Sequence, residues 1–227
     1  MTLRRVFIAG LLGATLSACL SPTANLLLSL IPDGTFSALL GNMKGVDTPT
    51  SDKLAELGQK EDWQGIAALA QENINKDPTH SDWWIIYGYS QVRLNQLVRA
   101  NQAFAEAVRL APDDIDGWNL YAESFRAMGQ PERAIRTLNN ALSVTRDSPM
   151  SYFVYGKSYG DLKMPQRAMQ YYQQALERQP QFAEAWYEYG RVAWSAGDRI
   201  EYSRAVQALQ RLNPSAAKQL TAFASGG

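Results

Sequence analysis

The sequence predicts an all-α solenoid of paired helices, and two observations carry this prediction. First, an aromatic residue recurs every 34 residues, at Trp84, Trp118, Tyr152 and Trp186. Second, each of these residues is followed at fixed distances by a tyrosine and a small residue, and in most units by alanines and a proline as well. A period of roughly 20 to 50 residues is typical of repeat architectures, in which each unit packs only on its neighbours. The region 81–216 is therefore predicted to be a stack of similar units.

Each unit is predicted to contain two helices. In 81–114, apolar residues recur at helical spacing from Trp84 to Val92 and again from Ala100 to Val108. A small residue in each first helix allows the second helix to approach closely; these residues are Gly88, Ala122, Gly156 and Gly190. A proline ends most units, and Pro131 and Pro165 are suited to the first position of a second helix, where the missing N–H costs nothing.

This pattern resembles the tetratricopeptide-repeat signature, in which an aromatic residue and a glycine precede alanines, a second aromatic residue and a proline. The resemblance implies a tetratricopeptide-repeat superhelix (α-solenoid) with a concave groove lined mainly by the first helix of each unit. We expect a repeat domain at 52–227, with units at about 52–80, 81–114, 115–148, 149–182 and 183–214. The first unit is degenerate, Tyr202 is expected to push out or rotate the last second helix, and 215–223 is expected to cap the stack, with Ser215 as its N-cap.

The N-terminus has the features of an export signal. Arg4 and Arg5 precede a mostly apolar run at 6–18, which is shorter than the roughly 20 residues needed to span a bilayer. Residues 1–18 are therefore predicted to be a signal peptide. The ending Leu16-Ser17-Ala18-Cys19 resembles the bacterial lipobox, which implies that Cys19 is lipidated after cleavage. The alternatives are an ordinary signal peptide, or an apolar leader with a chance cysteine.

The segment 19–51 is expected to be a lipid anchor followed by an apolar tether. Cys19 is the only cysteine, so the chain has no intramolecular disulfide. Leu20 follows it, and by resemblance to the sorting rule of such lipoproteins this implies the periplasmic face of the outer membrane. The apolar part, 26–40, is interpreted as a cap on the first repeat, as a segment docking on a membrane or partner, or as disordered chain.

The sequence shows no catalytic set, and no metal or cofactor is expected. His80 is the only histidine, which excludes histidine-rich metal sites, and no nucleophile has a recognisable setting. Asp113, Asp114 and Asp116 are interpreted as helix N-caps, with a weak calcium site as the alternative. The 22 basic and 22 acidic residues balance, so nothing suggests binding to nucleic acid.

The groove is therefore expected to carry the function. By resemblance to the family, positions two, five, nine and twelve of each unit face inward. The predicted partner-binding residues are Tyr89, Asn119, Glu123, Arg126, Phe153, Lys157, Tyr187, Arg191 and Trp194. The aromatic residues and Arg191 are of the types enriched in binding hot spots. The alternative is that some of them only pack in the core or at its rim.

These features predict a non-enzymatic adaptor, tethered by lipid in the bacterial envelope, that binds another envelope protein in its groove. The build resembles pilotins, which assist secretin rings, and lipoproteins that scaffold cell-wall or polysaccharide machinery. The alternative is a glycan- or peptidoglycan-binding module in which the groove aromatics stack on sugars. A homo-oligomer formed through the exposed ends of the stack is also compatible with the sequence.

Overall fold

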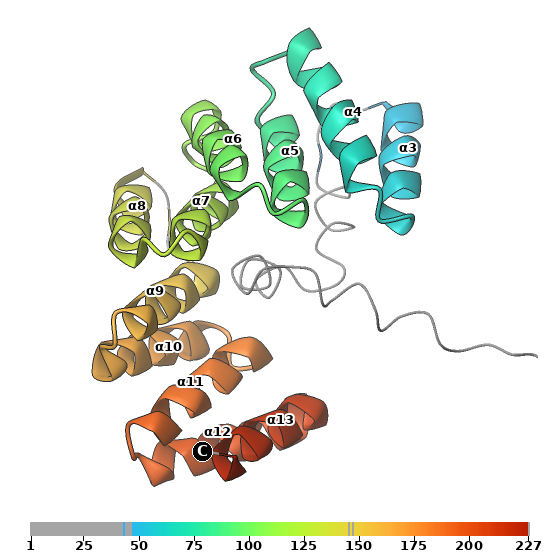
Figure 1. The fold of residues 1–227 in the computed structure, drawn as a ribbon. Helices are drawn as coiled ribbons and strands as arrows, with labels where there is room; N and C mark the ends of the chain where they lie inside the picture. Colours follow the sequence, from blue (N-terminus) through green and yellow to red (C-terminus); the bar gives the residue numbers. More distant parts are fainter. Residues whose placement is uncertain (1–42, 44–46, 145, 147, 227) are drawn as a thin grey trace, which may run out of the picture.

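The computed structural model describes residues 43, 47–144, 146 and 148–226. The predicted signal peptide, Cys19 and the apolar segment 26–40 lie outside the described residues. The described part is all-α, as predicted, and its helices follow one another along an arc (Figure 1). α7 lies on the inside of this arc and α8 on the outside.

The described helices form successive antiparallel pairs, followed by one last helix. Their bounds are α3 (Thr48–Gln59), α4 (Trp63–Lys76), α5 (Ser81–Arg93), α6 (Leu97–Leu110), α7 (Ile115–Ala127), α8 (Pro131–Val144), α9 (Pro149–Asp161), α10 (Pro165–Arg178), α11 (Ala183–Ser195), α12 (Arg199–Leu212) and α13 (Pro214–Ser225). Pro131 and Pro165 open α8 and α10, as the sequence predicts. The α3/α4 pair occupies the place of the degenerate first unit, although α3 begins four residues earlier than the expected boundary.

The turn inside each pair has the same backbone conformation. One residue per turn lies in the left-handed region, with φ between 52° and 80°, and these residues are 34 apart: Glu61, Asn95, Gly129, Lys163 and Gly197. Glycine adopts this region without cost, whereas the other residue types are strained there. The turn geometry therefore follows the repeat even where the glycine is missing, and it includes the α3/α4 pair in the same register.

Close contact between paired helices explains the small residue of each first helix. A Cβ atom on Gly88 would lie 2.6 Å from the Phe104 ring, and one on Gly156 would lie 2.5 Å from the Tyr172 ring. Both rings are buried. These contacts confirm the prediction that the glycine makes room for the second helix.

The last pair packs differently. The nearest α12 side chain to a Cβ on Gly190 is Ala205, at 2.9 Å, in place of the ring that Gly88 and Gly156 meet. The displacement of α12 expected from Tyr202 stays a prediction. α13 fills the remaining space, because a Cβ on Gly190 would lie 2.5 Å from Leu220. The cap of α13 differs from the sequence prediction: Asn213 accepts the Ala216 N–H at 3.1 Å, so α13 begins at Pro214 and Ser215 lies inside it. Proline at the first helical position favours this earlier start.

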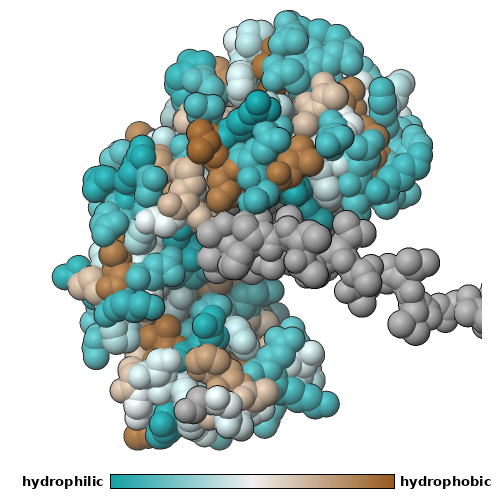
Figure 2. Space-filling model, viewed as in Figure 1, coloured by the Kyte–Doolittle hydropathy of each residue, from teal (hydrophilic) through white to brown (hydrophobic). Residues whose placement is uncertain are grey.

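The first pair is joined to the rest of the stack through an aromatic contact. Trp63 meets Tyr89 edge-on at 5.5 Å, and the Arg93 guanidinium lies 4.3 Å from the Trp63 ring centre. Figure 2 shows mostly hydrophilic residues on the visible face, with smaller hydrophobic patches between them. Among the described residues, no helix combines the length and the apolar character needed to cross a membrane.

Candidate interaction groove

The first helices of three consecutive pairs, α7, α9 and α11, border one hollow of about 450 Å³. α9 contributes Lys157 in the middle, and α7 and α11 contribute Arg126 and Arg191 on either side. The complete lining is Arg126, Lys157, Gly160, Asp161, Lys163, Pro165, Tyr172, Glu188, Arg191, Val192 and Ser195. Three of the predicted groove residues thus meet in one place, because they occupy inward positions of successive repeats.

A network of buried ion pairs forms one wall of the hollow. Glu123 is fully buried and accepts hydrogen bonds from two of the three guanidinium nitrogens of Arg126, Nε at 2.8 Å and Nη2 at 2.5 Å. Lys157 Nζ donates to the same carboxylate at 3.1 Å. Arg126 Nη1 also reaches Asp161 Oδ2 at 2.8 Å, so α7 and α9 are tied together twice. Charge-assisted bonds of this kind are stronger than neutral ones.

Burial and charge act in opposite directions in this network. Burial opposes the charge of Arg126, but Glu123 and Asp161 outweigh it and hold the pKa of the guanidinium above its usual value. Burial lowers the pKa of Lys157, and the attraction of Glu123 offsets only part of this effect. Glu123 is therefore shared by two buried cations, and its removal would leave both Arg126 and Lys157 without this partner.

The opposite wall belongs to α11 and is more open. Arg191 Nη1 lies 3.1 and 3.2 Å from the two Glu188 oxygens. Its guanidinium lies 6.0 Å from the Tyr187 ring centre and 5.1 Å from that of Phe223 in α13. Arg191 and Tyr187 are only partly buried. Arg191 lines the hollow, whereas Tyr187 does not belong to its lining, so this wall offers a cation to a molecule in the hollow.

Other predicted groove residues have structural roles. Tyr89 and Phe153 are only 3% exposed, so the expectation that they are exposed hot-spot aromatics is wrong. Phe153 packs at 4.9 Å on Phe182 and at 5.8 Å on Tyr172, because the close approach of helices around Gly156 leaves this ring inside the core. Asn119 is also buried; its amide donates to Ser148, the N-cap of α9, and accepts from Ser151.

Trp194 lies at the end of α11 and is partly covered. The Arg199 guanidinium stands 3.5 Å from its ring centre, and Tyr202 lies at 4.8 Å. A ring with a guanidinium on it offers less surface for stacking on a sugar. Trp194 is not among the residues that line the hollow.

Sequence reasoning missed four polar residues of the hollow: Asp161, Lys163, Glu188 and Ser195. They lie at positions six, thirteen and fifteen of their units, outside the set expected to face inward. One sequence feature did indicate the ion-pair network: Glu123 and Lys157 carry opposite charges at the same position of consecutive repeats.

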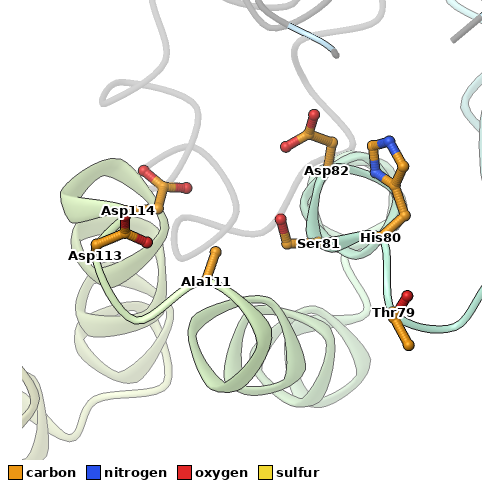
Figure 3. Close-up of a pocket in the computed structure, with 7 residues that line it drawn as sticks. All are labelled: Thr79, His80, Ser81, Asp82, Ala111, Asp113 and Asp114. Atoms are coloured by element: carbon orange, nitrogen blue, oxygen red, sulfur yellow. The ribbon is translucent and has the colours of Figure 1, made fainter. Parts of the chain in front are cut away.

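A second hollow of about 430 Å³ lies between the start of α5 and the turn before α7 (Figure 3). His80, Ser81 and Asp82 line it from one side, and Asp113 and Asp114 line it from the other. Asp114 is the N-cap of α7 and accepts the Asp116 N–H at 3.0 Å, which confirms the N-cap prediction for this residue. Asp116 lies inside the first turn of α7, and Asp113 precedes the cap, so neither is an N-cap. Burial raises the pKa of its carboxyl group. In the described ranges, no group of three or more His, Cys, Asp or Glu side chains is arranged to hold a metal ion.

Comparison with known proteins agrees with this architecture. Residues 149–192, which cover the α9/α10 pair and most of α11, match the tetratricopeptide-repeat family model. A search of curated proteins finds no match to the chain. The 34-residue period, the helix pairs and the family match together define the fold as a tetratricopeptide-repeat superhelix.

Several solved structures share the fold. PilW, described as a widely conserved type IV pilus biogenesis factor, is 18% identical with a TM-score of 0.65 over 80% of this chain and 91% of PilW. YrrB, described as a TPR protein with an unusual peptide-binding site, is 17% identical with a TM-score of 0.54 over 82% and 97%. TTC0263, a TPR protein of Thermus thermophilus, is 18% identical with a TM-score of 0.61 over 75% and 93%. At these identities the similarity establishes the fold alone.

Proposed function

We propose that the protein is a non-enzymatic adaptor that binds a segment of another protein in the hollow between α7, α9 and α11. The observation that carries the proposal is the lining of this hollow: buried ion pairs fix its α7/α9 wall, and the partly exposed Arg191 with its partner Glu188 forms its α11 wall. Curved repeat stacks generally use their concave surface for binding. Arginine is among the residue types enriched in binding hot spots, and Arg191 is accessible opposite a wall that ion pairs hold in place.

The charges of the lining indicate what the bound segment carries. Arg126, Lys157, Lys163 and Arg191 are basic, whereas Asp161 and Glu188 are acidic. Lys163 and Arg191 are the cations with access to solvent. An acidic side chain in the partner would be attracted to these two cations, so we expect the partner segment to contain at least one carboxylate.

We further propose that Cys19 is acylated and tethers this adaptor to the periplasmic face of the outer membrane, where it supports the assembly of an envelope complex. The support comes from the sequence: a charged start, an apolar run and a lipobox-like ending. PilW, which shares the fold, is described as a pilus biogenesis factor, which is in keeping with such a role.

The binding proposal is tested by comparing two charge reversals. Arg191→Glu places a negative charge beside Glu188 in the hollow, and Arg211→Glu makes the same change on the exposed surface of α12. Both tagged variants and the wild type are used to capture proteins from extracts that contain the envelope and the soluble fraction. We expect one protein to be recovered by the wild type and Arg211→Glu but not by Arg191→Glu. Recovery of no protein, or equal recovery by Arg191→Glu, would contradict the proposal.

The tether is tested separately with a Cys19→Ala variant. The wild type is expected to gain the mass of acyl chains and to sediment with outer membranes, whereas the variant stays unmodified and in the soluble fraction. If both forms are unmodified and soluble, the lipobox is a coincidence and the partner is to be sought among soluble proteins. This result would leave the groove proposal standing, because the two tests use different readouts.

A further inference from the structure

Charged residues are divided unevenly between the two layers of the helix pairs. The second helices of the last four pairs, α6, α8, α10 and α12, carry nine arginines against four glutamates, an excess of five positive charges. The first helices, α5, α7, α9 and α11, carry four basic and six acidic residues, an excess of two negative charges. Since α8 lies on the outside of the arc and α7 on the inside (Figure 1), the balanced charge of the chain conceals a basic outer layer.

Exposed apolar side chains follow the same division. Among the described residues, seven large apolar side chains are exposed, and none of them lies on a first helix. Five lie on second helices: Val98, Leu142, Val144, Ile200 and Leu212. Ile200 is 80% exposed, Val98 63% and Val144 53%. Scattered apolar residues are normal on a protein surface, whereas these share one layer with the excess of arginines.

α8 brings both features to one side of a helix. Arg136, Asn140 and Val144 follow Arg133 by three, seven and eleven residues, so all four side chains lie along the same side, and all four are exposed. Glu132, the only carboxylate of α8, lies in the first turn, where the helix dipole favours a negative charge. The exposed side of α8 is therefore basic in its first half and apolar at its end.

The arginines of this layer are held by aromatic rings. The Arg133 guanidinium lies 4.1 Å from the Phe125 ring centre, and Arg167, one repeat later, lies 5.4 Å from that of Tyr159. A guanidinium placed on a ring face keeps its N–H groups for other acceptors. Among the described residues, neither these two arginines nor Arg136 forms an ion pair with a carboxylate, and all three are exposed. Their positive charge is therefore not neutralised by a neighbouring carboxylate.

A hollow of about 370 Å³ beside Arg133 and Arg136 adds neutral donors. No described carboxylate belongs to its lining, which includes Asn139 and Asn140. The Tyr155 hydroxyl donates to Asn139 Oδ1 at 2.7 Å, so the amide N–H groups of Asn139 are turned to other acceptors. Guanidinium groups match the geometry of phosphate and can bind it with two N–H groups at once. The rim of this hollow is therefore suited to a phosphate group.

We infer that the outer layer of second helices, centred on α8, docks on an anionic lipid surface. Arg133, Arg136 and Arg167 bind headgroup phosphates, and Val144 enters the headgroup region. Peripheral membrane binding grows with the apolar area buried and with the attraction to anionic lipids, and this layer supplies both. A soluble polyanion would use the arginines alone, so the exposed aliphatic side chains favour a membrane. In this orientation the concave groove faces away from the lipid and stays open to its partner.

This contact is weak and reversible. Exposed charges are screened beyond about 8 Å at physiological salt. A curved stack also presents only some of its second helices to a flat surface at one time. Docking therefore orients the repeat domain on a membrane and does not replace an anchor, which needs a further attachment. The inference is independent of partner binding in the groove and of acylation at Cys19.

Vesicle sedimentation at low ionic strength tests the inference. All forms carry Cys19→Ala, so that no acyl group contributes, and all share the same N-terminus, so that differences between them report the repeat domain. Vesicles of phosphatidylcholine alone are compared with vesicles in which about a third of the lipid is phosphatidylglycerol. The outer-face variant combines Arg133→Gln, Arg136→Gln and Arg167→Gln. The control loses three exposed cations of the first pair and has the same net charge; it combines Lys53→Gln, Lys60→Gln and Lys76→Gln.

The parent chain is expected to sediment preferentially with the anionic vesicles and to be released at high salt. The outer-face variant is expected to bind these vesicles roughly 100-fold more weakly, which corresponds to about fivefold for each cation near an anionic surface. The control is expected to bind nearly as well as the parent chain. Thermal unfolding of each form shows that it is folded.

A second measurement tests the orientation without removing any arginine. Cys19 is the only cysteine, so the Cys19→Ala chain can be labelled with a fluorophore at a single new cysteine, through Val144→Cys or Ser195→Cys. Position 144 is at the end of α8, and position 195 lines the groove hollow. A quencher carried by the lipid is expected to quench the label at position 144 and to leave the label at position 195 bright.

Three results would overturn the inference. One is equal sedimentation of the parent chain with both kinds of vesicle. Another is an equal loss of binding in the outer-face variant and in the lysine control, which would show that net charge alone is responsible. The third is equal quenching of the labels at positions 144 and 195.

Discussion

Lys157 donates a hydrogen bond to Glu123 at 3.1 Å, and these two residues occupy the same position of consecutive repeats. The bond therefore crosses from one repeat to the next, at the α7/α9 wall of the hollow. Glu123 holds Arg126 as well, and Arg126 reaches Asp161 at the end of α9. The network sets the relation between α7 and α9, and with it the shape of the proposed binding hollow.

Removal of the central carboxylate is expected to be strongly destabilising. Glu123→Gln leaves Arg126 and Lys157 buried without their shared partner, and breaking a buried pair in this way costs about 3–5 kcal/mol. Lys157→Met is expected to cost clearly less, because Glu123 keeps Arg126. The free energy of unfolding, measured with urea, compares the two. Glu56→Gln, in an exposed pair with Lys60, is the control and is expected to change little. Equal effects of all three variants would contradict the account.

Contact between helices at Gly156 gives a second prediction. Gly156→Ala forces a methyl group to within 2.5 Å of the Tyr172 ring, and overpacking of this kind costs about 1–3 kcal/mol. Gly160→Ala is the matched control on the same helix, where a Cβ meets no atom within 4 Å. Alanine favours the helical state over glycine, so the control is expected to be neutral or stabilising, by up to about 1 kcal/mol. Urea unfolding of both variants measures the difference in stability. A loss of stability in Gly160→Ala alone would contradict the close contact proposed at Gly156.

The left-handed turn residues give a third prediction. Lys163 has a φ of 57°, a region that costs residues with a side chain about 1–2 kcal/mol. Lys163→Gly is expected to raise the midpoint of thermal unfolding. Gly129→Ala, at the same turn position with a φ of 73°, is expected to lower it. A lower midpoint for Lys163→Gly would show that the lysine side chain contributes more than the strain costs.

Stability at alkaline pH gives a fourth prediction. Burial raises the pKa of the Tyr155 and Tyr189 phenols above their usual value near 10. Below pH 10 these phenols are protonated in both the folded and the unfolded chain, and their contribution to stability is fully present. Above pH 10 the unfolded chain loses these protons first, so stability falls as pH rises. Urea unfolding between pH 9 and pH 11 measures the slope. Tyr189→Phe is expected to make the slope shallower, and an unchanged slope would contradict the assignment.

The repeat period made most of the fold predictable from the sequence. Aromatic residues, glycines and prolines at fixed spacing predicted the paired helices, the close contact at Gly156 and the starts of α8 and α10. The exact cap of α13 was not predicted, because both Asn213 and Ser215 are suitable N-cap residues and the choice depends on where Pro214 lies. The shared left-handed turn escaped notice because Glu61, Asn95 and Lys163 stand where glycine would have revealed it.

The groove was predictable only in part. The repeat register placed Arg126, Lys157 and Arg191 at inward positions, and all three line the hollow. It also selected Tyr89 and Phe153, which are buried. The repeat register predicts which face of a helix a side chain lies on, but it does not predict how closely the neighbouring helices pack against that face. Asp161 and Glu188 enter the hollow through the curvature of the stack, which depends on the packing of whole helices.

The central claim is that the hollow between α7, α9 and α11 holds a partner protein, and site-specific photocrosslinking in living cells tests it most directly. A photoreactive amino acid replaces Ser195, which lines the hollow and is exposed, or Gln170, which is exposed on α10 outside it. We predict a crosslinked product of one defined mass from position 195, lost when Arg191→Glu is added, and no such product from position 170. Crosslinks of the same protein from both positions, or from neither, would contradict the account.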